Sequence, residues 1–122
     1  MTRTRILAAT LALLCLLTVN QAYAAETDAD AVYCYSAADF SDAPDLKGIC
    51  ITGLPDKTCG TVLLDSRVIC AGDILTVQQV EQLTFCPLQT DTDREATLTY
   101  LPIYENRVEA AETMTLAIRG KK

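Results

Sequence analysis

The sequence predicts an all-β fold, a two-sheet antiparallel sandwich with one or two short helical turns. Two segments near the C-terminus, 96–101 and 113–118, alternate apolar and polar residues, as strands with one buried and one solvated face do. Roughly six or seven short strand-like segments follow one another with turns between them. No helical pattern is long enough to cover a sheet, which argues against parallel strands joined by helices. A closed barrel is the alternative fold.

The first 24 residues have the pattern of a secretory signal peptide. Arg3 and Arg5 precede the apolar run 6–19, and Ala22 and Ala24 place small side chains where signal peptidase requires them. Cleavage is therefore expected after Ala24. The apolar run is shorter than the roughly 20 residues that span a bilayer, and no comparable run follows. The mature chain is expected to be exported, with no membrane span.

Removal of 1–24 leaves 98 residues (122 − 24), which suit one domain. Segment 25–31 is small and acidic and is expected to be a flexible tether, with the folded domain at 32–120. The mature chain has 8 Lys and Arg against 16 Asp and Glu, so the formal charge changes from −6 to −8. Such a surface repels nucleic acid and anionic lipid, and neither is expected as a partner.

The first half of the domain contains two predicted strands. Segment 32–35 is aromatic and β-branched, and Ser36 with Asp39 three residues later indicates one short helical turn. Segment 46–54 is the second strand, in which Gly53 is expected to mark a bulge.

The second half begins with a predicted hairpin, whose strands 61–64 and 67–69 flank Asp65-Ser66. A turn follows at 71–73, and Thr76 is expected to cap a short amphipathic helical segment at 77–83. Strand 83–87 comes next and ends at a proline. Its alternation directs Phe85 into the core, and Thr84 and Cys86 outward.

Cys15 is removed with the signal peptide, and export exposes the remaining cysteines to conditions in which disulfides persist. The candidate disulfide cysteines are Cys34, Cys50, Cys59, Cys70 and Cys86. Because five is odd, one thiol stays free or bonds another chain, and the pairing is open. The alternative is that all five are reduced and act as small apolar residues. The absence of histidine and of Cys-x-x-Cys argues against zinc.

Three motifs follow one another along the domain: a Gly-Thr strand at 60–65, a Gly-Asp turn at 72–73 and a Leu-Thr-Phe-x-Pro strand at 83–87. Together they resemble the bacterial cadherin-like repeat, which is related to the repeats of chondroitin-sulfate proteoglycan ectodomains. The resemblance covers roughly residues 46–118. It implies an Ig-like, cadherin-like sandwich of the kind found in the first module of large exported surface proteins of gut Firmicutes. Cys70 and Cys86 depart from the pattern, so no disulfide scheme is implied.

Catalysis is not expected from this sequence. Without histidine, the usual proton shuttle and the Ser-His and Cys-His pairs are absent. Asp91, Asp93 and Glu95 lie close together, but a glycosidase needs its carboxyl groups across a cleft that about 98 residues hardly build. No catalytic residue and no cofactor is assigned.

The same three acids, Asp91, Asp93 and Glu95, are the candidate calcium ligands. Their alternating spacing opens like an EF-hand loop but lacks its glycine and its distal glutamate. A solvated loop between two strands is the favoured interpretation.

The sequence thus predicts a non-enzymatic module, secreted or at the cell surface, for adhesion, spacing or binding of an extracellular protein or glycan. A further expectation is that the chain is the N-terminal fragment of a longer surface protein. The alternative function is a small secreted effector or inhibitor stabilised by disulfides.

Overall fold

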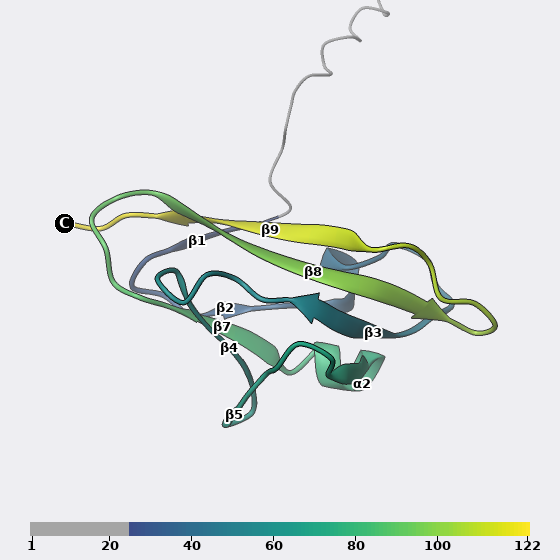
Figure 1. Ribbon diagram of the computed structural model, residues 1–122. Coiled ribbons are helices and arrows are strands. Elements are labelled where there is room, and N and C mark those ends of the chain that lie inside the picture. Colours follow the sequence, from purple (N-terminus) through teal and green to yellow (C-terminus); the bar gives the residue numbers. More distant parts are fainter. Residues whose placement is uncertain (1–24) are drawn as a thin grey trace, which may run out of the picture.

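The two alternating segments near the C-terminus form a long hairpin of β8 (Arg94–Tyr104) and β9 (Glu112–Arg119) in the computed structural model, which describes residues 25–122 (Figure 1). The predicted signal peptide, 1–24, lies outside the described residues. The other elements are β1 (Ala25–Asp28), β2 (Tyr33–Cys34), the 3-10 turn η2 (Ala37–Asp39), β3 (Leu46–Gly53), β4 (Gly60–Leu64), β5 (Arg67–Val68), β6 (Ile74–Thr76), α2 (Val77–Val80) and β7 (Leu83–Pro87).

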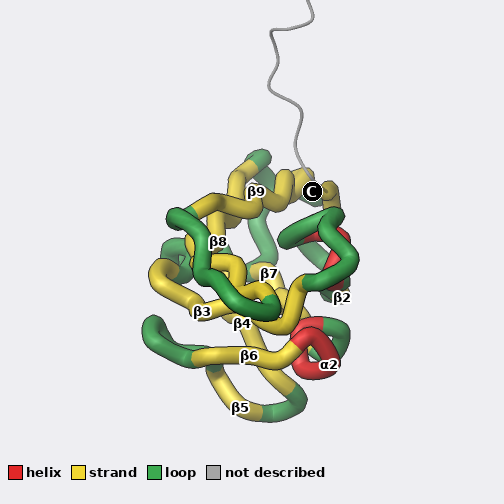
Figure 2. Tube along the Cα trace, turned by 90° about the vertical axis from the view of Figure 1, so that its right-hand side faces the viewer, coloured by secondary structure: helices red, strands yellow, loops and turns green. Residues whose placement is uncertain are grey.

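These strands form two sheets that pack face to face, as Figure 2 shows from the side. The five-stranded sheet has the order β1-β9-β8-β3-β6, and the four-stranded sheet has the order β2-β7-β4-β5. The core lies between them, where Phe85 from one sheet and Leu98 and Leu116 from the other are fully buried. The predicted all-β, two-sheet sandwich is therefore confirmed, with one parallel pair, β1 and β9, among antiparallel ones.

The acidic segment 25–31 is not a flexible tether, and that prediction is wrong. Strand β1 pairs in parallel with β9, with Asp28 opposite Arg119. Thr27 and Ala29 are buried, and the Ala29 amide donates to the Arg119 carbonyl at 2.8 Å. The sequence shows no apolar alternation at 25–28, because the inward side chains of this strand are small or polar and its acids point outward.

Most of the other predicted elements are confirmed. The register of β3 against β8 shifts between Ile51 and Gly53, at the expected bulge. Asp65 takes a positive φ of 56° in the β4–β5 turn, a conformation that aspartate tolerates better than most residues. The Thr76 hydroxyl accepts from the Gln79 amide and caps α2. Strand β6 was not expected, because its three residues are too few to show a pattern.

Three tyrosine hydroxyls contact residues 36–41, which belong to the connection between the two sheets. Tyr33 donates to the Asp39 carboxylate at 2.8 Å, and Tyr100 donates to the Phe40 carbonyl at 2.6 Å. The Tyr104 hydroxyl lies 2.9 Å from the Ser41 hydroxyl. The Phe40 ring packs between Tyr35 and Tyr100, with centroid separations of 5.5 and 5.0 Å. These contacts fix the connection against β2 and β8.

Tyr35 has the one buried side-chain polar atom without a hydrogen bond among residues 25–122, its hydroxyl oxygen. Because an unsatisfied buried hydroxyl costs about 1 to 3 kcal/mol, we expect Tyr35→Phe to keep or raise the free energy of unfolding. Tyr100→Phe is the matched variant, since it removes the bond to the Phe40 carbonyl and is expected to cost about 1 kcal/mol or more. Urea titration of both variants measures the difference, and a Tyr35→Phe protein weaker than Tyr100→Phe would contradict it.

Alkaline pH is expected to destabilise the sandwich through its buried phenols. Burial raises the pKa of Tyr100 to about 12 and that of Tyr35 above its ordinary range. Above the ordinary phenol pKa of about 10, the unfolded chain loses protons that the folded chain retains, so the free energy of unfolding falls as the pH rises through that window. Urea midpoints measured between about pH 8 and about pH 11 follow this loss, and Tyr100→Phe should make it shallower.

Candidate functional site

The outer face of the five-stranded sheet changes character along its strands, from apolar through hydroxyl-bearing to charged. We call it the graded face. It consists of the outward side chains of Glu26, Asp28, Cys50, Ile74, Glu95, Thr97, Thr99, Leu101, Ile103, Val108, Thr113, Thr115, Ala117 and Arg119. Directly opposed residues in neighbouring strands point to the same side, so the register places these side chains in rows.

The apolar end of the graded face is a row across three strands. Cys50 lies opposite Ile74 of β6 on one side and Leu101 of β8 on the other. Ile74 is 68% exposed. Ile103 and Val108 form an isolated bridge beside this row and extend it towards the β8–β9 turn. An apolar patch of this kind contacts water in the free protein and loses that contact on binding.

Four threonines occupy the middle of the graded face. Thr97 lies opposite Thr115 and Thr99 lies opposite Thr113, and the hydroxyl oxygens of the first pair are 3.4 Å apart. Their neighbours Leu98 and Met114 point into the core, which fixes the hydroxyls outward. This part therefore presents a row of hydroxyl donors and acceptors.

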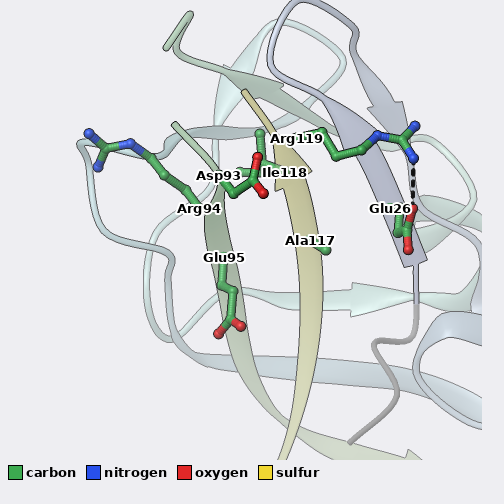
Figure 3. A pocket seen from close by; sticks show the side chains of 7 residues that line it. All are labelled: Glu26, Asp93, Arg94, Glu95, Ala117, Ile118 and Arg119. Carbon is green, nitrogen blue, oxygen red and sulfur yellow. Dashed lines mark hydrogen bonds and ion pairs between the residues drawn. The ribbon is translucent and has the colours of Figure 1, made fainter. Parts of the chain in front are cut away.

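The charged end contains a hollow of about 680 Å³ (Figure 3). In the register, Ala117 lies between Glu26 of β1 and Glu95 of β8. The small alanine side chain forms the floor, and the two longer acids flank it.

Arg119 organises the charges around this hollow. Its guanidinium donates to Glu26 at 3.0 Å and to Asp28 at 2.9 Å, and Figure 3 shows it reaching over β1. The hydrogen bond from Arg119 lowers the pKa of Asp28, and the same bond raises the pKa of Arg119. Arg94 points to the other side and lies 3.5 Å from the Thr58 hydroxyl. The two pairs of Arg119, with Glu26 and with Asp28, are exposed and solvated. Such pairs suit the binding of a charged partner more than proton transfer.

The structure separates the three candidate calcium ligands. Asp93 and Glu95 line the hollow, whereas Asp91 does not. The Asp93 carboxylate accepts from the Gly120 amide at 2.9 Å, so it closes the loop onto the C-terminal end of β9. Within residues 25–122, no group of three or more His, Cys, Asp or Glu side chains could hold a metal ion. The sequence does not indicate Glu26 and Arg119 as site residues, because they meet only when β1 pairs with β9.

No disulfide links the five cysteines of the described chain, all of which are free. Cys59 is buried, and its thiol donates to the Glu95 carbonyl at 3.3 Å. Cys50 belongs to the graded face, while Cys34 and Cys86 lie on the outer side of the four-stranded sheet. Cys70 is exposed in the turn before β6. The expected disulfide framework finds no support in this arrangement.

Comparisons with known proteins give no relative from which a role could be taken. No family model matches this chain, and no curated protein or solved structure matches it. The cadherin-like resemblance therefore stays a prediction from the three sequence motifs. Between residues 25 and 122 the structure also contains no helix long and apolar enough to cross a membrane.

Proposed function

We propose that the protein is an exported, non-enzymatic binding module that recognises an extracellular protein or glycan through the graded face. The observation that carries the proposal is the succession of three surface chemistries on one sheet. Apolar side chains, hydroxyls and paired charges are the groups by which proteins are recognised, and the hydroxyls and charges also suit glycans.

The proposal requires no chemical step from these residues. The charged hollow holds Arg119 between carboxylates at ordinary ion-pair distances, and its lining has neither a thiol nor a hydroxyl nucleophile. Binding by a preformed sheet surface also avoids the entropic cost of ordering a loop. Export and surface display belong to the same proposal and rest on the signal-peptide pattern of residues 1–24.

The test compares two half-buried, outward-facing threonines, one on each sheet. Mature protein 25–122 is applied to arrays of extracellular-matrix proteins and of glycans, and its affinity for each hit is measured. Thr99→Arg places a bulky cation in the middle of the graded face and is expected to weaken binding about tenfold or more. Thr84→Arg makes the same change on the outer side of β7 and is expected to leave binding unchanged. Equal binding by both variants would move the site off the graded face.

A further inference from the structure

A separate apolar groove lies between the β3–β4 connection and the β4–β5 hairpin. Its volume is about 270 Å³. Val62 and Ile69 form its buried floor, with exposed fractions of 4% and 1%. Leu54 and Val68, which also line it, are 38% and 55% exposed. The groove therefore leaves apolar side chains in contact with water that a ligand would cover.

Lys57 supplies the only ionisable side chain of the groove lining. Among the ion pairs within residues 25–122, none involves Lys57. The neighbouring Asp56 does not line the groove, and its carboxylate accepts from both the amide and the hydroxyl of Thr58, at 2.9 and 2.8 Å. The lining of the groove therefore carries one positive charge and no negative one, which favours anions there although residues 25–122 together carry a formal charge of −8.

We propose that this groove binds a carboxylate carried on a short apolar group, with the carboxylate at Lys57 and the apolar part on Val62, Val68 and Ile69. The volume of 270 Å³ holds about nine groups of the size of a water molecule, each about 30 Å³. That space suits an acid of six carbons, of which the last is the carboxylate carbon. A free short-chain acid and the C-terminal residue of a peptide share this chemistry.

Two carboxylate probes distinguish these sources. Hexanoate represents the free acid, and 1-hexanol and hexylammonium are its neutral and cationic controls. Acetyl-Gly-Leu represents the peptide terminus, and its C-terminal amide is the neutral control. Each probe is titrated into isotope-labelled mature protein, and backbone chemical shifts report both the affinity and the residues affected.

At least one carboxylate probe is expected to shift the groove residues and to bind about two- to fivefold tighter than its uncharged control, the ratio that an exposed ion pair provides. Lys57→Gln should abolish that preference and leave the weak binding of 1-hexanol unchanged. Lys47→Gln is the matched control, since Lys47 is an exposed lysine on β3 that pairs with Glu105, and it should retain the preference. The proposal is overturned if no probe shifts the groove residues, if hexylammonium binds as well as hexanoate, or if the preference survives Lys57→Gln.

Discussion

Phe85→Ala is expected to leave the domain of residues 25–122 largely unfolded in water. Phe85 is fully buried on β7, which lies between β2 and β4 in the four-stranded sheet. Its direct partners in those strands are Tyr33 and Val62, so the cavity would open where three strands meet. Truncation of a buried phenylalanine costs about 3 to 5 kcal/mol, a large share of the roughly 5 to 10 kcal/mol that a small domain has. Urea titration followed by far-ultraviolet circular dichroism measures the loss.

Cys86→Ser, one residue along the same strand, is the control. Its side chain is half-buried on the outer side of β7, and its thiol is free. Its cost should stay near 0.5 kcal/mol, with and without reductant, because no disulfide is lost. A reductant-sensitive cost of about 2 to 5 kcal/mol would instead indicate a disulfide at Cys86. If Phe85→Ala unfolds at the urea concentration of the parent protein, the inward register of β7 is wrong.

The strands that the sequence predicts best are those whose inward residues are large. In β8 and β9, Leu98, Tyr100, Met114 and Leu116 are all buried, and each is followed by a half-buried residue. Period-two alternation is then visible without any knowledge of the partner strand. The local signals at Gly53, Asp65-Ser66 and Thr76 are equally independent of the rest of the chain, and each is confirmed.

The charged end of the graded face could not be predicted, because it depends on a long-range parallel pairing. Glu26 meets Arg119 only when β1 lies beside β9, and the two residues are far apart in the sequence. The acids of β1 indicate a solvated segment on their own, and the burial of Ala29 becomes visible only in the fold. Asp93 and Glu95 are candidates because they are clustered in the sequence, whereas a calcium site made of the three acids would also require Asp91 to line the hollow, which it does not.

A close approach of two backbones at the start of β4 explains the glycine of the Gly-Thr motif. Gly60 has a φ of 151° and pairs with Pro87 of β7. A Cβ placed on Gly60 would lie 2.3 Å from the Cys86 carbonyl oxygen and 2.7 Å from the Phe85 ring. Neither neighbour can yield easily, because one is backbone in a paired strand and the other is the fully buried core phenylalanine. The position therefore requires a residue without a side chain.

Gly60→Ala is accordingly expected to cost about 3 kcal/mol or more, the sum of a backbone conformation that alanine rarely adopts and an overpacked contact with β7. Gly72→Ala separates the two terms: Gly72 also has a positive φ, 99°, but no atom lies within 4 Å of the added methyl group. It should cost only about 1 to 2 kcal/mol, from the backbone alone. Urea midpoints of the two variants give the comparison directly. If Gly60→Ala costs no more than Gly72→Ala, β4 and β7 do not approach each other as closely as this register requires.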